Sequence, residues 1–458
     1  MNENTKNDEV LNREIHLGML VRFALPTILS TVFMSIYSSV DGMFVARLVD
    51  TDALSAVNIV MPMIFISSGI GMMFGSGGNA LVAKKLGERK EQEAREDFSL
   101  LLLVAFISSL VIVALCAIFL KPLLHLLGAD EGLMAYCIPY MIPVLISMPF
   151  TIFGTIFSMS YITVGKANLG LAMSVLGGVL NIVLDWLFIA VFHMGITGAA
   201  VATSIGYAST SVIGLIYFIV CRKHDLYVVR PKWRSKTIIQ SCVNGSSEMI
   251  GVFAGSIVAI LFNNILMRLA GADGVASITI MLYVQSLFNA VYRGYATGIA
   301  PVISYNYGAA NKERLRKIHK ISTGLILAAS AALTVICYIL APVMVRFFAG
   351  SNQGVYEMAL HGFRIFATSC LLTGINVYAS ALFTALNDGK TSAILSFCRT
   401  VVFLVIPVAA LPVVFGLDGV WAAIPVGELL SILMSIYYFR KLHFGYRSVG
   451  GDSIEYKS

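Results

Sequence analysis

The stretch from Phe23 to Val40, FALPTILSTVFMSIYSSV, holds 18 residues without a charge and is followed directly by Asp41. An apolar run of this length is a candidate for a helix that crosses the hydrocarbon core of a bilayer, which is about 30 Å thick. A carboxylate in such a helix is costly, so acids at these positions usually serve transport, proton transfer or ligand binding. The stretch therefore predicts a membrane-spanning helix with a functional acid.

The composition assigns the whole chain to the membrane. Hydrophobic residues fill 58% of the 458 positions and charged residues fill 12%, about half of the roughly 25% found in an average soluble domain. Apolar windows recur along the chain, so we expect an all-α integral membrane protein with twelve transmembrane helices. The expected spans are 19–48, 54–80, 98–120, 133–158, 168–191, 196–219, 237–267, 275–305, 319–341, 360–384, 391–413 and 418–439.

Lys and Arg residues are divided unevenly between the loops. Loops after even-numbered spans hold eighteen of them, and loops after odd-numbered spans hold four. Because basic loops stay inside, this bias predicts a multi-pass protein of the cytoplasmic membrane with both termini in the cytoplasm. The first 17 residues lack the apolar centre of a signal peptide, which predicts a cytosolic tail. The net charge of +7 follows from the loop bias, so we expect the lipid bilayer and no nucleic acid as a partner.

The two halves of the chain resemble each other at an offset of roughly 220 residues. Gly87 is echoed by Gly308, and the turn Gly195-Ile-Thr-Gly198 is echoed by Gly416-Leu-Asp-Gly419. Six spans in each half give the halves one orientation, so we expect two six-helix bundles related by a parallel repeat, with a cavity between them. The predicted division is a tail over 1–17, a first lobe over 18–220, a linker over 221–236, a second lobe over 237–440 and a tail over 441–458.

Several oxygen-bearing side chains fall at similar depth in the first lobe. Asp41 lies about 9 Å inside the outer end of its span at 1.5 Å per residue. Asn181 and Asp185 are spaced i, i+4 and share one helix face. Thr203 and Tyr140 each lie seven residues inside the outer ends of their spans. Oxygen donors gathered in this way can hold a hard cation such as Na+, or share protons between paired acids.

A structural role for the same side chains stays open, because Asn, Thr and Tyr often join membrane helices by hydrogen bonds. The two acids favour function, since neither has a basic residue within its own span apart from Arg22 near the opposite face and Arg47 at the outer end. Equal depth leaves the lateral distance between these residues undetermined.

Charged residues of the second lobe admit two interpretations. Glu248, near mid-membrane in the seventh span, could attract a cationic substrate or pair with Arg293 of the eighth span. Glu428 and Arg399 stand at comparable depth in adjacent spans, which predicts a salt bridge. Aromatic and Met side chains could line a cavity for flat cations, although most such residues simply pack. The candidates are Tyr37, Met61, Phe65, Phe153, Met159, Tyr283, Phe288 and Tyr292.

The chain resembles the bacterial branch of the multidrug and toxic compound extrusion (MATE) family over essentially its whole length. The matching patterns are Asp41-Gly-Met-Phe-Val, Asn181-Ile-Val-Leu-Asp185, Gly198-Ala-Ala-Val-Ala-Thr203 and Ser304-Tyr-Asn-Tyr-Gly-Ala, with Pro26 in the first span. The resemblance implies an antiporter that expels small organic cations in exchange for H+ or Na+. It also implies a cation site at Asp41, Asn181, Asp185, Thr203 and Tyr140, and a first helix that bends around Pro26. Met34 stands where some relatives have Gln.

Two other functions are open. A flippase for lipid-linked oligosaccharides has a related two-lobed architecture, but it needs a cationic groove, and the intramembrane basic residues are few: Arg22, Arg293, Arg364 and Arg399. A membrane-embedded enzyme is the other, but the sequence has no HExxH pattern and no nucleophile motif, so we expect no enzymatic activity. The sequence also lacks an ATP-binding loop and metal-type Cys spacing. We therefore expect a monomer without a cofactor other than its coupling ion.

Overall fold

The computed structural model describes residues 14–48, 51–222, 224–349 and 352–442, and every regular element in these ranges is helical. The first half forms α2 (Leu17–Leu48), α3 (Thr51–Met72), η1 (Met73–Gly78), α4 (Asn79–Gly87), α5 (Glu91–Ile118), α6 (Leu120–Leu126), α7 (Met134–Thr163), α8 (Ala167–Asp185), η2 (Trp186–Val191) and α9 (Gly195–Val220). The second half forms α10 (Ser235–Gly308), α11 (Lys312–Ala349), α12 (Gln353–Phe366), η3 (Ala367–Ser369), α13 (Cys370–Ala385), α14 (Gly389–Phe397), η4 (Cys398–Val402) and α15 (Phe403–Arg440).

Ten helical segments in the described ranges are long and apolar enough to cross a bilayer, and two of them contain two crossings each. Helix α10 is broken at Gly271, where φ is 61°, and the segment Gly389–Arg440 is broken at Gly416, where φ is 57°. Glycine adopts these left-handed angles without the steric cost that a Cβ atom brings. The described part of the chain thus contains the twelve crossings that the sequence predicts.

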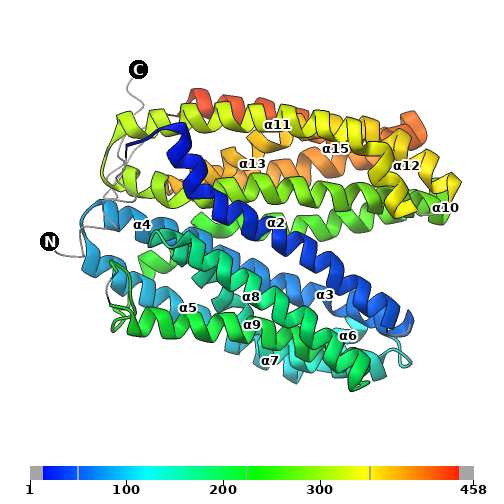
Figure 1. Ribbon diagram of the computed structural model, residues 1–458, viewed down its shortest axis with the longest axis horizontal. Helices are drawn as coiled ribbons and strands as arrows, with labels where there is room; N and C mark the ends of the chain where they lie inside the picture. The colour runs from blue at the N-terminus through cyan, green and yellow to red at the C-terminus, as the bar shows by residue number, and fades with distance from the viewer. Residues whose placement is uncertain (1–13, 49–50, 223, 350–351, 443–458) are drawn as a thin grey trace.

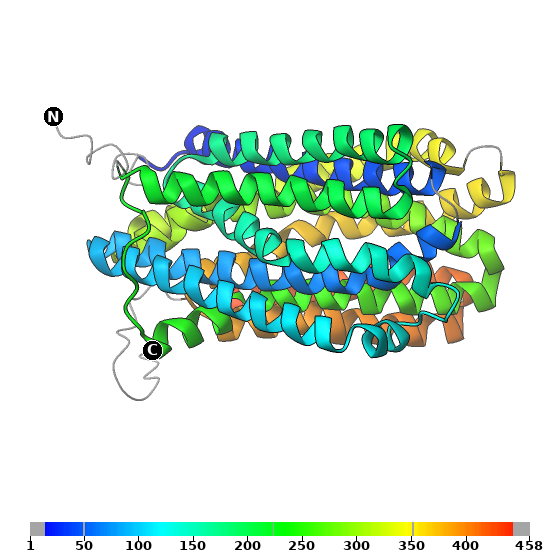
Figure 2. The same ribbon diagram turned by 90° about the horizontal axis from the view of Figure 1, so that it is seen from below.

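The helices form two bundles that lie side by side. Figure 1 shows α3 to α9 in the lower bundle and α10 to α15 in the upper one, and α2 runs obliquely between them. Helix α2 packs on α8 of the first bundle and on α10 of the second. In Figure 2 the long helices of both bundles run along the same axis. The predicted two-bundle architecture is confirmed.

The two bundles approach each other closely through a reciprocal pair of glycine contacts. A Cβ atom added at Gly87, the last residue of α4, would collide with the carbonyl oxygen of Tyr305 in α10. A Cβ atom added at Gly308, the last residue of α10, would collide with the carbonyl oxygen of Lys84 in α4. The step along the chain from Gly87 to Gly308 equals the step from Lys84 to Tyr305. The internal repeat therefore places the same contact on both sides of the boundary between the bundles.

The linker runs along the first bundle at the end of the molecule where α4 ends (Figure 1), and ion pairs hold it there. Arg234 lies 2.8 Å from Asp97 and 2.6 Å from Glu96, and Lys232 lies 2.7 Å from Glu96. Both acids are buried near the start of α5. Lys85 of α4 also reaches Asp97, at 2.6 Å. The linker is thereby fixed beside the glycine contacts.

Candidate functional site

A cavity of about 570 Å³ lies in the first bundle and extends to the boundary with the second. Its walls come from α2, α7, α8 and α9, and α10 closes one side. The lining mixes hydroxyl and amide groups with thioethers and phenols, among them Met34, Tyr37, Met159, Tyr161 and Tyr207. The volume is within the range of cavities that enclose drug-sized molecules.

Asn181 and Thr203 meet at the wall of this cavity. Asn181 Nδ2 donates a hydrogen bond of 3.2 Å to Thr203 Oγ1, which joins α8 to α9. Asn181 is only 2% exposed, and its Oδ1 atom accepts no hydrogen bond from any described residue. An amide oxygen left in this state is available as a ligand for a cation.

Asp185 lies one helical turn beyond Asn181, at the last residue of α8. Its side chain is fully buried, and the chain continues from it directly into the π-helical turn η2. Turns of this kind interrupt the helical hydrogen-bond ladder and are frequent at functional sites. Asp41 belongs to α2, but its side chain lies outside the described part of the structure. Of the predicted ion site, the structure thus brings together Asn181 and Thr203 and places Asp185 beside them on α8.

Two other residues expected at this site have different surroundings. Tyr140 of α7 is 5% exposed and packs in the core of the first bundle, and it is not part of the 570 Å³ cavity. Pro26 lies inside α2, nine residues after the helix begins. It is close in sequence to Thr27 and Ser30, which line the cavity.

The structure separates the candidates for a substrate cavity into three groups. Tyr37 and Met159 line the 570 Å³ cavity, and Glu248 lines a cavity of the second bundle. The others line neither: Met61, Phe153 and Phe288 pack against the cores, Tyr292 is buried with its hydroxyl donating to the Cys370 carbonyl oxygen, Phe65 is 37% exposed and Tyr283 is 46% exposed. Sequence reasoning missed Met34, Met173, Tyr161 and Tyr207, because an aromatic or Met residue at helical spacing looks the same whether it faces a cavity or a core.

The second bundle contains a separate polar cavity of about 220 Å³. Its charged residues are Glu248, Arg293, Arg399 and Glu428, which form two ion pairs. Arg293 Nη2 lies 2.6 Å from Glu248 Oε2, and Arg399 Nη2 lies 2.7 Å from Glu428 Oε1. The predicted Glu428–Arg399 pair therefore forms, and of the two interpretations of Glu248 the structure shows the pairing with Arg293. Arg293 also lines the 570 Å³ cavity, so its guanidinium stands between the two spaces.

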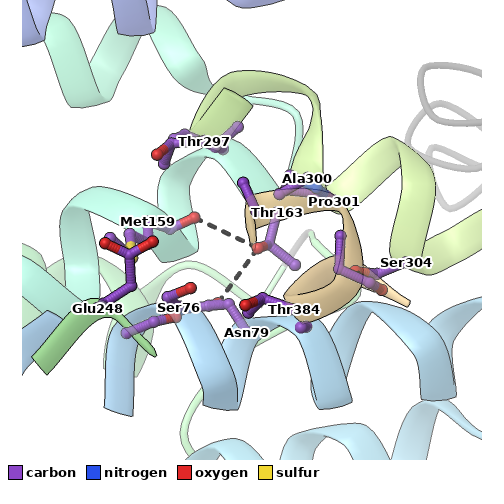
Figure 3. A pocket seen from close by; sticks show the side chains of 15 residues that line it. Ser76, Asn79, Met159, Thr163, Glu248, Thr297, Ala300, Pro301, Ser304 and Thr384 are labelled. Atoms are coloured by element: carbon purple, nitrogen blue, oxygen red, sulfur yellow. Dashed lines mark hydrogen bonds between the residues drawn. The ribbon is translucent and has the colours of Figure 1, made fainter. Parts of the chain in front are cut away.

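A small pocket of about 30 Å³ lies between the bundles, lined by residues of η1, α4 and α7 on one side and of α10 and α13 on the other. Figure 3 shows Thr163 in its wall, with its hydroxyl donating to Asn79 Oδ1 at 3.2 Å and to the Met159 carbonyl oxygen at 3.3 Å. Glu248 and Thr297 border this pocket and the cavity of the second bundle. The pocket has room for about one water molecule, so the space between the bundles is nearly filled here.

Oxygen atoms dominate the candidate ion site. Among the described side chains, no group of three or more His, Cys, Asp and Glu residues is placed to hold a metal ion. The amide of Asn181, the hydroxyl of Thr203 and the carboxylate of Asp185 are instead hard donors of the type that suits Na+ or a proton.

Comparison with curated proteins finds relatives of similar length. The chain is 24% identical to the multidrug export protein MepA of Staphylococcus saprophyticus over 432 residues, which cover 92% of this chain and 93% of the relative. It is 24% identical to MepA of Staphylococcus aureus (strain MRSA252) over 425 residues, which cover 91% and 92%.

Solved structures share the fold. A MATE protein in complex with MaD3S superposes with a TM-score of 0.89 at 23% identity, covering 96% of this chain and 98% of that one. A transporter of the MOP superfamily from Pyrococcus furiosus, described as having a binding pocket of reverse polarity, gives 0.88 at 23% identity over 96% and 98%. An outward-facing multidrug resistance MATE family transporter gives 0.86 at 24% identity over 92% and 94%.

The MatE family model matches the chain twice, over residues 26–187 and over residues 249–411. The two matches fall in the two bundles, in agreement with the internal repeat. Together they span more than half of the sequence. The chain therefore belongs to the MatE family, the multidrug and toxic compound extrusion proteins that its sequence motifs resemble.

Proposed function

We propose that this protein is a secondary active multidrug exporter, which expels small organic cations in exchange for H+ or Na+ by alternating access. The observation that carries the proposal is the 570 Å³ cavity, which has the Asn181–Thr203 pair in its wall. A space for the exported compound and a donor set for the driving ion thus share one wall. Such proximity lets occupancy of one site change the energy of the other.

The lining of the cavity supports a broad specificity for flat cations. Tyr37, Tyr161 and Tyr207 offer ring faces to a positive charge, which contributes about 0.5–2 kcal/mol per contact. Met34 and Met159 add thioether side chains that adapt to ligands of different shape. The names of the staphylococcal relatives, multidrug export proteins, agree with this proposal.

The coupling ion would bind between α2, α8 and α9, at Asp41, Asn181, Asp185 and Thr203. A fully buried carboxylate such as Asp185 is stable as an anion only with a cation or hydrogen-bond donors nearby. A proton or Na+ from outside binds at this buried carboxylate, and its release on the other side of the membrane drives the cycle. No further cofactor is part of the proposal.

The conformation supports alternating access. The basic loops predict that the end carrying Gly87, Gly308 and the linker faces the cytoplasm. The bundles meet there backbone to backbone, and the pocket of about 30 Å³ above that contact is nearly filled. We assign this state as closed towards the cytoplasm, with both termini on that side of the cell membrane.

A flippase for lipid-linked oligosaccharides is the alternative. Such a protein needs several guanidinium groups without counter-charges to balance the multiple negative charges of a pyrophosphate, whereas Arg293 and Arg399 are each balanced by a glutamate. This pairing favours the exporter.

Proteoliposomes test the proposal. Efflux of the fluorescent cation ethidium is measured with Na+ and proton gradients imposed separately, for the natural protein and for Asp41→Asn and Asp185→Asn. We expect gradient-driven efflux by the natural protein and its loss in both variants, since each variant keeps the side-chain size and removes the charge. Efflux at the natural rate by both variants would refute the assigned ion site, and absence of efflux by the natural protein with either gradient would refute the exporter.

A further inference from the structure

The polar cavity of the second bundle is electrically balanced. Its lining contains two carboxylates and two guanidinium groups, and the remaining polar groups, such as Gln285 and Asn289, are neutral. Every charge in it already has a partner within the protein. A ligand that carries a single charge would therefore have to break a pair and leave the displaced group uncompensated.

The two ion pairs differ in their exposure and in the number of hydrogen bonds that they make within the protein. We call the buried, multiply bonded pair closed and the exposed, singly bonded pair open. Glu428 accepts hydrogen bonds from Nε and Nη2 of Arg399 and a further one of 2.6 Å from Asn376 Nδ2. Its side chain is only 8% exposed. Both oxygens of the Glu428 carboxylate are thus engaged by protein donors, and the pair holds α13, η4 and α15 together.

The Arg293–Glu248 pair is open. The two side chains touch through a single contact of 2.6 Å between Nη2 and Oε2, and they are 39% and 21% exposed. Among the described residues, the only other polar contact of the guanidinium is with the Met72 sulfur at 3.7 Å. Nε and Nη1 of Arg293 and Oε1 of Glu248 thus retain hydrogen-bonding capacity towards the cavity.

We infer that the Arg293–Glu248 pair is a binding site for zwitterionic ligands, namely compounds that carry an ammonium group and a carboxylate on one small skeleton. The ammonium group would pair with Glu248 and the carboxylate with Arg293. Both charges of the protein then keep a partner, whereas a simple cation satisfies Glu248 and strands Arg293, and a simple anion does the reverse.

The position of the pair also defines where the rest of the ligand lies. Arg293 and Asn289 line both the 220 Å³ cavity and the 570 Å³ cavity. An apolar or aromatic group attached to the zwitterion can therefore extend past Met72 towards Tyr37 and Met159, which line the larger space. The predicted ligand is an aromatic zwitterion that spans the boundary between the bundles.

Three indole compounds test the contributions of the ligand's ammonium group and carboxylate separately. Tryptophan is a zwitterion, tryptamine carries the ammonium group alone, and indole-3-propionate carries the carboxylate alone. Binding of each to the purified full-length protein in lipid nanodiscs is measured by isothermal titration calorimetry. We expect tryptophan to bind about fivefold more tightly than the other two, a preference of the size that a partly exposed ion pair provides.

Variants of the pair should change the order of affinity. In Arg293→Gln tryptamine should bind best, because Glu248 is left without its partner, and in Glu248→Gln indole-3-propionate should bind best. The exchange variant Glu248→Arg with Arg293→Glu keeps both charges and should keep the preference for tryptophan, which excludes simple misfolding as the cause. Arg346→Gln serves as the control, because it removes an arginine with one side-chain hydrogen bond, to Gln353, outside both cavities.

The inference rests on the proposed function in taking these cavities as the route of the exported compound, but its test uses no ion gradient. Loss of ion-driven efflux would therefore leave the order of affinity unaffected. Equal or tighter binding of tryptamine by the natural protein, undetectable binding of tryptophan, or an unchanged order in both single variants would overturn the zwitterion site.

Discussion

Gly87 and Gly308 occupy equivalent positions in the two bundles, and each packs against a backbone carbonyl of the other bundle, Tyr305 in one case and Lys84 in the other. The backbone beyond them is equivalent too. Arg89 and Ala310, each two residues further along, both adopt left-handed angles, with φ of 60° and 54°. The boundary at this end is therefore built from two copies of one local structure.

Larger side chains at these glycines should force the bundles apart. Gly87→Val and Gly308→Val place side-chain atoms where backbone oxygen atoms now lie, and backbone cannot rotate away as a side chain can. We expect the population open at this end to rise, measured as an increased distance between spin labels on α4 and the end of α10. Gly324→Ala is the control, since nothing lies within 4 Å of its added Cβ atom. Unchanged distances in both valine variants would contradict the assigned contact.

Positions 89 and 312 should be accessible from the same side of the membrane. Both lie at the end that carries the glycine contacts, at the α4–α5 turn and at the start of α11. In a background without the seven native cysteines, Arg89→Cys and Lys312→Cys should react with an impermeant maleimide only in inside-out vesicles. Labelling of the two positions from opposite sides would end the parallel-repeat topology.

Asn181→Ala should weaken Na+ binding about tenfold while leaving the fold intact. The substitution removes an amide oxygen available for the ion and the hydrogen bond that orients Thr203. Thr203→Ala should cost a similar factor, and the double variant should cost less than the two effects combined, because the side chains act as one unit. Equilibrium binding of 22Na+ to the purified protein measures these effects. Fully additive losses would show that the two side chains act separately.

Na+ and protons should compete for the proposed ion site. A carboxylate binds Na+ only when it is deprotonated, so the apparent affinity for Na+ should fall as the pH is lowered from about 8 to 5 and should recover when it is raised again. In Asp185→Asn the apparent affinity for Na+ should change less over the same pH range, because one carboxylate that can bind a proton has been removed. Sodium affinity that stays constant over this range in the natural protein would contradict a shared site.

Removing one member of the closed ion pair should destabilise the second bundle. Glu428→Gln leaves the Arg399 guanidinium without its counter-charge in a largely buried place, which costs about 3 kcal/mol. Arg399→Met together with Glu428→Met should cost less than the single variant, because no charge is stranded. Thermal unfolding in detergent, followed by tryptophan fluorescence, measures the order. A double variant less stable than Glu428→Gln would disprove this account.

The sequence predicted where the helices lie along the chain better than it predicted which side of each helix faces a cavity. Apolar windows identify all twelve crossings, and the echo of Gly195 by Gly416 is confirmed by left-handed φ angles of 55° and 57° at the two turns. The short helix α6, Leu120–Leu126, was not predicted, because seven residues are too few to show a period. Helices such as α4 and α11 also extend beyond the expected spans, since polar residues outside the bilayer continue the helix.

Depth along a helix can be counted from the sequence, but direction around its axis requires knowledge of the neighbours. Asn181 and Thr203 were placed at one depth and do meet, whereas Tyr140 at a matching depth faces the core. The Glu428–Arg399 pair was predicted because an isolated charge in a membrane needs a partner, and pairing with Arg293 was one of the two interpretations of Glu248. The openness of the Glu248–Arg293 pair and the closure of the Glu428–Arg399 pair depend on packing, which the sequence does not reveal.

The closed pair has a consequence for how the duplicated halves divide their work. The helix that carries Asp185 in the first half passes into a π-helical turn, and so does its counterpart in the second half, where Arg399 stands within the turn. The guanidinium of Arg399 is a cation that is covalently part of the chain, so it cannot be released to either side of the membrane. In the proposed transport cycle, the first half therefore exchanges its cation with the surroundings, whereas the second half keeps Arg399, a cation that is part of the chain.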